Sequence, residues 1–400
     1  MDNETCPSSG SNYRWFMLAQ IWLIYYVFAI ISSSIPPLIT PMSSDLALSH
    51  SQMGVILGAM HLIYIPLAIP MGLLIDRIGV RRSILTGITL VSLSGLLQSL
   101  AVGFETLFLS VCLLGLGGPT ISVGAPKAVA SWFIGRDRGT ASGIYLTGFI
   151  TGVATATAIT NTAVMPLMGT WRNTLALYGF LGFLMVCIWL LFGRERTRSQ
   201  GREVASVSLR DDVRVLLRER HVWMIAVIGF SSFFVRHSLG GWLPKLLELR
   251  GMGPAKAGLL ASIPSWCGLI GSTAIPRLGK TGTRKHILSV ALLVQGICVF
   301  IMGTTIGPPL IASLIIYGIS TYTILPLLMV ALMEAPRVGA RYMGVAGGLF
   351  FSIGEVGGFL GPSMVGVLLD QTGSTLPSII ALTAVVEGML IPTLLLKENK

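Results

Sequence analysis

Charged residues are scarce in this sequence. Asp, Glu, Lys and Arg together make up 11% of its 400 residues, whereas hydrophobic residues make up 53%. A soluble domain carries about 25% charged residues, so this composition excludes an ordinary soluble protein. The chain is therefore expected to cross a membrane several times and to have the lipid bilayer as its surroundings.

The patterns of several other protein classes are also missing. No Walker loop is present, so ATP-driven pumping has no support. The five cysteines show no metal-ligand spacing, and no set of histidines and carboxylates shows one either. The chain begins with polar residues, and its first apolar run is too long for the core of a cleavable signal peptide. With no catalytic constellation in the sequence, we expect no enzyme activity, no cofactor and no bound metal.

Positive charge is abundant but one-sided. The net charge of +11 would suit nucleic acid, yet most of the 28 Lys and Arg residues fall in loops on one side of the apolar stretches. Such a bias marks the cytoplasmic side of a membrane protein. We therefore expect no nucleic-acid partner, both termini in the cytoplasm, and a place in the plasma (inner) membrane of a prokaryote.

Twelve apolar stretches are long enough to cross a bilayer. They are predicted at 15–40, 52–74, 83–103, 106–132, 139–164, 172–193, 221–247, 255–276, 286–304, 308–333, 341–368 and 376–396. The longest polar segment, 194–220, separates an N-terminal half (1–193) from a C-terminal half (221–400), each with six spans. Within this linker, 207–217 has the pattern of an amphipathic helix on the inner surface.

The two halves repeat each other at an offset of about 203 residues. The matching positions are 79–85 with 282–288, Pro41 with Pro244, and Arg138 with Arg341. Three separate matches at one offset predict parallel repeats related by an axis along the membrane normal.

The loop between the second and third spans carries the most specific motif. Residues 72–82 read GLLIDRIGVRR, which resembles the signature between helices 2 and 3 of the major facilitator superfamily. Residues 132–143 resemble a run found between helices 4 and 5 in transporters of organic or inorganic anions. Residues 357–362 resemble the glycine-rich G-x-x-x-G-P motif, which in that superfamily is more often in helix 5. Within that superfamily, the sequence most resembles the bacterial small-anion members of the cyanate or monocarboxylate type.

This resemblance covers nearly the whole chain and implies a fold. An all-α membrane protein is expected, with twelve transmembrane helices in two pseudo-symmetric six-helix halves around one central site. The resemblance also implies that helices 4 and 7 line the central cavity.

Ionisable residues at membrane depth are the main candidates for function, because each is costly unless paired or hydrated. Arg236 lies about fifteen residues into its span, roughly 22 Å from the start of the helix. Its guanidinium offers a two-pronged donor for a carboxylate or a similar oxyanion. Lys127 in span 4 would provide a second cation facing Arg236, and His237 beside Arg236 would titrate near neutral pH. The alternatives are that the two cations snorkel to the membrane surface, or that Arg236 forms a structural pair with a carboxylate.

Glu355, deep in span 11, is the candidate for proton exchange, or else neutralises Arg236 when no substrate is bound. Glu387 and His61 fit an interhelical pair and a hydrogen-bonded packing residue better than a functional role. Aromatic residues would supply cavity hydrogen bonds or simply pack. They are Tyr25, Tyr26, Tyr145, Trp266, Tyr317 and Tyr322, of which Tyr25, Tyr145 and Tyr322 are the chosen substrate-binding candidates.

Charged residues at the inner ends of the spans form a second group. In the family that the chain resembles, such charges make an ion-pair network that holds the outward-open state. Carried over to this sequence, Asp76 would pair near Arg341, and Glu334 would pair with basic residues of the corresponding loop in the second half. The expected inner-gate residues are Asp76, Arg77, Arg138, Glu334 and Arg341.

These features favour a monomeric secondary transporter that moves a small organic or inorganic anion together with protons, by symport and alternating access. A proton-coupled exporter of apolar or cationic drugs is an alternative, which Glu355 favours and the two deep cations oppose. A membrane sensor that transports nothing is an alternative of another class, and it would normally carry a long tail or a soluble domain.

Overall fold

The computed structural model describes residues 11–195, 216, 219–275, 283–335 and 338–396. Throughout these residues the regular structure is helical. The predicted amphipathic helix at 207–217 and most of the predicted linker lie outside the described residues, so the division of the chain at 194–220 stays a prediction.

The first part of the chain forms the N-terminal group of helices. Its members are α1 (Ser11–Ser32), α2 (Ile35–Asp45), α3 (His50–Ile78), α4 (Val80–Ser99), α5 (Phe104–Trp132), α6 (Arg136–Ile159), the π-helical turn η2 (Thr160–Val164), α7 (Met165–Met168) and α8 (Trp171–Phe192). The remainder forms the C-terminal group. Its members are α10 (Arg220–Leu249), α11 (Pro254–Thr273), α12 (Arg284–Thr304), α13 (Pro308–Glu334), α14 (Gly339–Thr372), α15 (Leu376–Gly388) and α16 (Leu390–Leu395).

Ten helical segments of the described residues are long and apolar enough to cross a membrane. The helices α3 and α11, of 29 and 20 residues, complete the predicted set of twelve. Span edges differ by a few residues from the predicted ones, most visibly at the first span. There the helix is interrupted at residues 33–34 and the span continues as α2, which has Pro36 and Pro37 in its first turn.

The sharp turn of the 72–82 motif has a local cause. Gly79 adopts φ +86°, a conformation that other residues rarely accept. A Cβ at this position would also meet the Glu195 carboxylate at 2.8 Å. Glu195 Oε1 accepts a hydrogen bond of 2.9 Å from the backbone N–H of Val80 and so caps the start of α4. The glycine of the motif is therefore required both by the bend and by the cap.

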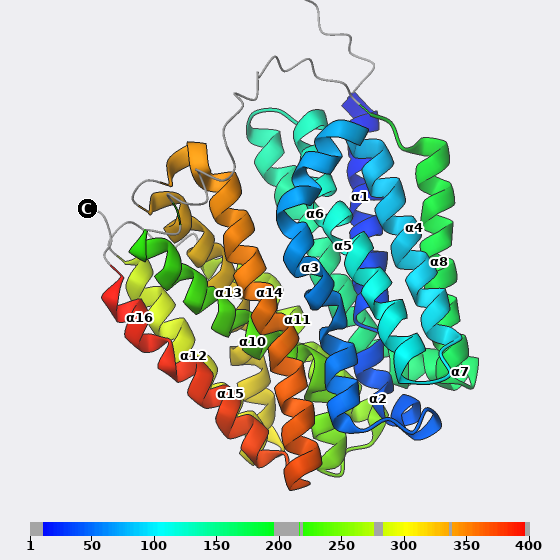
Figure 1. Cartoon of the computed structure of the whole chain (residues 1–400), viewed down its shortest axis with the longest axis vertical. Helices are drawn as coiled ribbons and strands as arrows, with labels where there is room; N and C mark the ends of the chain where they lie inside the picture. Colours follow the sequence, from blue (N-terminus) through cyan, green and yellow to red (C-terminus); the bar gives the residue numbers. More distant parts are fainter. Residues whose placement is uncertain (1–10, 196–215, 217–218, 276–282, 336–337, 397–400) are drawn as a thin grey trace, which may run out of the picture.

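The helices reproduce the repeat found in the sequence. The starts of α3, α4, α5, α6 and α8 recur about 204 residues later as the starts of α11, α12, α13, α14 and α15. Figure 1 shows the two groups side by side, with α3 packed along α14 at their boundary. The helix pair α6 and α11 makes the equivalent contact between the groups.

Glycines bring α3 and α14 unusually close together. A Cβ on Gly54 would meet the carbonyl oxygen of Pro362 at 2.6 Å, and a Cβ on Gly58 would meet that of Phe359 at 2.8 Å. Small residues at such positions let helix backbones approach each other within a membrane. This close approach fixes which side chains of the two helices face each other further along the crossing.

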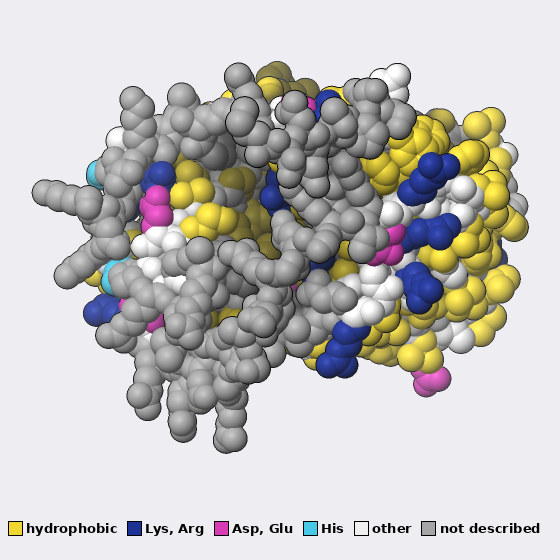
Figure 2. Space-filling view, turned by 90° about the horizontal axis from the view of Figure 1, so that it is seen from above, with side chains coloured by type: hydrophobic (Ala, Val, Ile, Leu, Met, Phe, Trp, Pro, Cys, Tyr) yellow, Lys and Arg dark blue, Asp and Glu magenta, His cyan; other side chains and the backbone are white. Residues whose placement is uncertain are grey.

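The two ends of the bundle differ. Figure 1 shows the groups diverging toward the end at which α1 begins, and Figure 2 looks onto this end, where Lys and Arg side chains gather over the N-terminal group. We call it the basic end. At the opposite end, Asp370 of α14 caps α3 of the other group. Its Oδ1 accepts a hydrogen bond of 3.0 Å from the backbone N–H of His50 and lies 2.9 Å from Nδ1 of the same residue. Its Oδ2 accepts a hydrogen bond of 2.7 Å from the backbone N–H of Ser51.

A second link joins the groups at this end. Lys245 of α10 donates to the Thr40 hydroxyl of α2 at 2.9 Å, and Thr40 donates in turn to the Glu248 carboxylate. We call the Asp370 cap and the Lys245–Thr40–Glu248 contacts together the latch. They tie the two groups together at the end opposite to the basic end.

Replacing Asp370 with Asn is expected to loosen the latch, because hydrogen bonds to a charged acceptor contribute about 1.5–3 kcal/mol each. We expect a new population with longer distances between spin labels at Val102 and Ile306, which are exposed on opposite groups at this end. Pulsed electron paramagnetic resonance measures these distances. Asp45→Asn is the matched control, since Asp45 pairs with Arg172 inside the N-terminal group. An unchanged distance distribution in Asp370→Asn would show that the latch does not hold this end.

Candidate functional site

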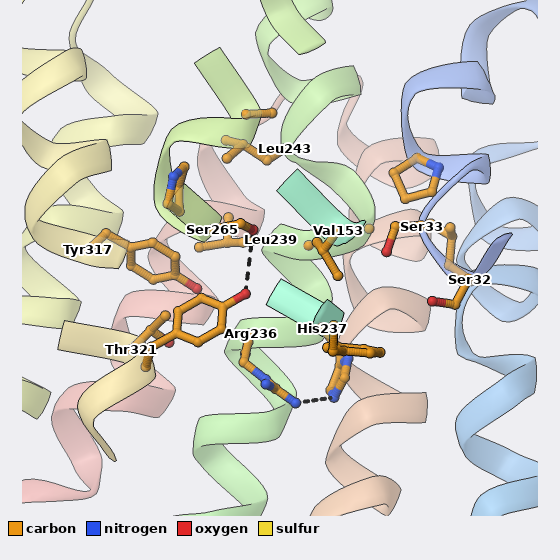
Figure 3. Close-up of a pocket in the computed structure, with 18 of the residues that line it drawn as sticks. Ser32, Ser33, Val153, Arg236, His237, Leu239, Leu243, Ser265, Tyr317 and Thr321 are labelled. Carbon is orange, nitrogen blue, oxygen red and sulfur yellow. Dashed lines mark hydrogen bonds between the residues drawn. The ribbon is translucent and has the colours of Figure 1, made fainter. Parts of the chain in front are cut away.

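A cavity of about 150 Å³ lies between the two groups of helices. Both groups contribute to its wall: α1, α2, α3 and α6 from one, and α10, α11 and α13 from the other. Figure 3 shows Arg236, Tyr317 and Thr321 along one side of it, with Val153, Ser32 and Ser33 toward the other. The C-terminal group thus supplies most of the polar wall, and the N-terminal group adds apolar side chains such as Leu57, Met60 and Phe149.

Arg236 enters this cavity from α10 and has unusual neighbours. Its Nη2 lies 3.3 Å from Nε2 of His237, and its guanidinium carbon lies 5.1 Å from the ring centre of Phe233. A guanidinium only donates hydrogen bonds, so Nε2 of His237 accepts and this ring is neutral. Among the described residues, no carboxylate forms an ion pair with Arg236. Most of the five N–H donors of this guanidinium therefore have no acceptor among the described residues.

A buried pair crosses between the groups beside the cavity. His61 of α3 and Glu355 of α14 are joined by a hydrogen bond of 2.5 Å between Nδ1 and Oε2. The His237 ring lies against His61, with ring centres 3.9 Å apart. Gly358 makes room for all three: a Cβ there would meet Glu355 at 2.9 Å, His61 at 3.1 Å and His237 at 3.2 Å. The glycine-rich motif of α14 is thus part of the site.

These three residues have the chemistry of a metal site, since their ligand atoms lie within 4.8 Å of one another. Two features favour a hydrogen-bonded His61–Glu355 pair over a metal site. The 2.5 Å separation of His61 and Glu355 is shorter than the roughly 3.3 Å between two ligands of a tetrahedral zinc ion. The permanent positive charge of Arg236 beside His237 also opposes a cation.

Three hydroxyl groups of α13 complete the polar side. Tyr322 lies 3.4 Å from the Ser265 hydroxyl of α11, and Thr321 accepts a hydrogen bond of 2.9 Å from Gln295 of α12. Tyr317 is only 3% exposed, and its hydroxyl lies next to the side chains of Thr321 and Gln295.

The structure brings together part of the predicted substrate site. Arg236, His237 and Tyr322 line the cavity, and Glu355 reaches it through His61. Tyr25 and Tyr145 do not line this cavity; they pack on each other at 5.3 Å, and Tyr25 donates to the Ser122 carbonyl of α5. Lys127, half-buried in α5, is not part of its wall either, so the expected facing of Lys127 and Arg236 across this cavity is not seen. The substrate roles of these residues stay predictions.

The predicted inner-gate residues lie at the basic end. Arg77 and Arg138 are exposed there. Glu334, at the end of α13, forms an ion pair with Arg284 at the start of α12, which is a pairing of the predicted kind. The side chains of Asp76 and Arg341 lie outside the described residues, so their pairing stays a prediction.

His61 has a larger part in the site than its sequence predicts. A hydrogen bond was expected for it, but not a partner on the other group of helices. Its spacing held a signal: Gly54, Gly58 and His61 follow one another at intervals of four and three residues, so they share the face of α3 on which α14 crosses. The repeat-related position of His61 is Pro264, so this buried pair has no counterpart at the equivalent α6–α11 contact.

Two six-helix groups around a central polar cavity, closed at one end and diverging at the other, are the architecture of a membrane solute transporter. The family model of the Major Facilitator Superfamily matches residues 21–362, and the chain belongs to this superfamily.

Comparison with known proteins gives relatives of low identity that match over most of their length. A hexuronate transporter of Bacillus subtilis (strain 168) is 23% identical, covering 82% of each chain. A probable galactarate/D-glucarate transporter of Escherichia coli (strain K12) is 24% identical, covering 89% of this chain and 88% of its own. A nitrite extrusion protein of B. subtilis (strain 168) is 24% identical, covering 90% and 88%.

Among solved structures, a bacterial homolog of the human lysosomal transporter Spinster, in an inward-facing and occupied conformation, superposes with a TM-score of 0.73. It is 18% identical, with 96% of this chain and 94% of that one covered. This likeness shows the fold. Together with the family match, it identifies an integral membrane protein of the transporter class.

Proposed function

We propose that this protein is a secondary active transporter of a small anion and that Arg236 binds the anion. The observation that carries the proposal is Arg236 itself, which lines the cavity and whose hydrogen-bond and cation–π partners among the described residues are a neutral ring and a phenyl face, with no carboxylate. A guanidinium at membrane depth is costly without a counter-charge. Glu355, the internal candidate for that charge, is bonded to His61 instead. The named substrates of the relatives, which are uronate, aldarate and nitrite ions, support an anion.

Alternating access follows from the closed latch and the diverging basic end. If the basic end is cytoplasmic, as its charge favours, both termini face the cytoplasm and the structure is inward-facing. The latch then closes the outer side of a prokaryotic inner membrane. Opening to the outside requires the latch to break and the basic end to close, around a cavity that stays at the centre of a monomer.

Proton coupling is the finer part of the proposal. The His61–Glu355 pair joins the two groups next to the ring that contacts Arg236. An anion that draws Arg236 away from His237 frees the Nε2 lone pair of His237. A proton can then be shared among His237, His61 and Glu355. Anion binding and protonation would thereby favour each other, which is what symport requires.

The inner gate belongs to the same proposal. Asp76→Asn is expected to weaken transport without unfolding the protein, because it would remove the ion pair expected between Asp76 and the region of Arg341 and not a substrate contact. The rate at which a reagent added from the outside labels a cysteine introduced into the cavity wall should fall, because the outward-open state would lose a stabilising pair. Asp137→Asn is the matched control, since Asp137 pairs with Arg14 within the N-terminal group at 3.2 Å. Unchanged labelling and flux in Asp76→Asn would remove Asp76 from the gate.

Transport by purified protein in proteoliposomes tests the main proposal. The panel contains carboxylates, cyanate, nitrate, nitrite, sugars and cationic drugs, each with and without an imposed pH gradient. We expect saturable uptake of an anion. Uptake of cationic drugs alone would favour the exporter, for which the nearby Glu355 is the supporting feature. Absence of any flux together with retained ligand binding would favour the sensor.

A further inference from the structure

One pair of prolines at equivalent positions of the two halves lies inside helices. Pro41 belongs to the interior of α2 and Pro244 to the interior of α10. Proline has no backbone N–H, so it cannot donate to the carbonyl oxygen four residues earlier in its helix. Those oxygens belong to Pro37 in α2 and Gly240 in α10. Each of them therefore depends on a donor from outside its own helix ladder.

In the N-terminal half, the protein itself supplies the missing donor. Nδ2 of Asn161, in the π-helical turn η2, donates to the Pro37 carbonyl at 2.6 Å, and both residues are buried. At an offset of 203 residues the counterpart of Asn161 is Met364, whose side chain has no donor. The C-terminal half thus repeats the proline but not the side chain that compensates for it.

The Gly240 backbone lies at the central cavity. Gly240 is exposed and lines the same cavity as Arg236, and a glycine can line it only with backbone atoms. A Cβ on Gly240 would meet no atom within 4 Å, so the space beside this backbone is open. Within the described part of the chain, no side chain donates to its carbonyl. The wall therefore offers a backbone acceptor one turn of α10, about 6 Å, beyond Arg236.

We propose that the carbonyl oxygen of Gly240 is a substrate-binding acceptor, to which the anion held by Arg236 donates from a hydroxyl or ammonium group at its other end. The inference rests on the proposed anion transport and adds a second contact to it. Pro244 creates this contact, because it removes the N–H that would otherwise bond to the oxygen. A methyl group at the far end of the anion forms no such bond. An ionised carboxylate there only accepts, so it would face another acceptor.

Ligands that differ only at the far end test the acceptor on the purified full-length protein. One set is γ-hydroxybutyrate, γ-aminobutyrate, butyrate and succinate, and the longer set is ε-hydroxycaproate, ε-aminocaproate, caproate and adipate. Calorimetry at neutral pH gives each affinity. In at least one set we expect a donor-bearing ligand to bind about fivefold more tightly than the plain chain, which is the effect of one hydrogen bond. The dicarboxylate should bind no more tightly than the plain chain.

Removal of the proline tests what makes the acceptor available. Pro244→Ala returns an N–H to the position from which a helix donates to the Gly240 oxygen. The ratio of the two affinities should then fall close to one, while the plain chain still binds through Arg236. Pro41→Ala is the matched control, since the oxygen that Pro41 frees is already bonded to Asn161, and it should keep the wild-type ratio. If Pro244→Ala aggregates, Pro244→Val, which supplies the same N–H, is measured in its place.

The outcomes separate this inference from the proposed function. Equal binding across both sets, or a ratio that Pro244→Ala leaves unchanged, overturns the role of Gly240 while Arg236-dependent anion binding stands. An equal fall of the ratio in Pro41→Ala also overturns it, because the effect would then be a general one of proline removal. If no anion binds, or if binding is indifferent to Arg236→Ala, the anion proposal itself fails. Preference for the hydroxyl alone or for the ammonium alone supports the acceptor and names its donor.

Discussion

Replacing Arg236 with alanine is expected to abolish anion binding and transport while the protein stays folded. Removing one side of a charged contact costs about 2–5 kcal/mol, or roughly 30-fold or more in affinity. The fold should tolerate the change because Arg236 is held by the His237 ring and the Phe233 face and not by a carboxylate. Its loss therefore strands no buried negative charge, which is the usual cause of severe damage when an ion pair is broken.

Lysine at this position separates charge from shape. Arg236→Lys keeps the positive charge but loses the planar, two-pronged donor, so we expect a weaker site and a raised apparent KM for a carboxylate. A small inorganic anion should be less sensitive to this change. Arg172→Ala serves as the control, because Arg172 pairs with Asp45 within the N-terminal group.

Calorimetry with each ligand, together with size-exclusion chromatography for monodispersity, gives the readout. Wild-type affinity in a monodisperse Arg236→Ala protein would show that Arg236 is structural. The proposal of an anion site would then lose its main support. If Arg236→Ala aggregates, Arg236→Lys is measured in its place, and its affinity for the carboxylate should still fall.

The fold was predictable because its determinants are local or periodic. Apolar runs of bilayer length, the excess of Lys and Arg on one side, and the repeat offset are all readable without knowing any contact. The depth of Arg236 was equally accessible, since rise per residue converts position in a helix into distance. The Glu195 cap of the turn at Gly79 has no such signal in the sequence, because it depends on a contact between distant residues.

Pairings between helices were not predictable in the same way. Arg236 and His237 are adjacent and point about 100° apart on a helix, yet they meet because the long arginine side chain reaches around. His61 and Glu355 are 294 residues apart, and their contact depends on where α3 crosses α14. The expected meeting of Lys127 and Arg236 rested on which helices line the cavity in the family, which does not fix where along the cavity each side chain falls.

Replacing Glu355 with glutamine is the second change for which we expect a large effect: loss of uptake driven by a pH gradient. Glutamine has the same shape, and its side-chain oxygen still accepts a hydrogen bond from Nδ1–H of His61, so the contact between the groups should survive. What it cannot do is take up and release a proton. Exchange of labelled for unlabelled substrate, which needs no net proton movement, should therefore continue at near wild-type rates.

The control for this change is Glu387→Gln, which removes a carboxylate of α15 that lies against Gly296 of α12, outside the cavity wall. Both variants lose one carboxyl group from a membrane-spanning helix, so any general effect on insertion or stability appears in both. Only Glu355→Gln should separate gradient-driven uptake from exchange. If gradient-driven uptake survives in Glu355→Gln, the proton is carried elsewhere. His237, which faces Arg236 directly and contacts the same His61 ring, is then the next residue to replace.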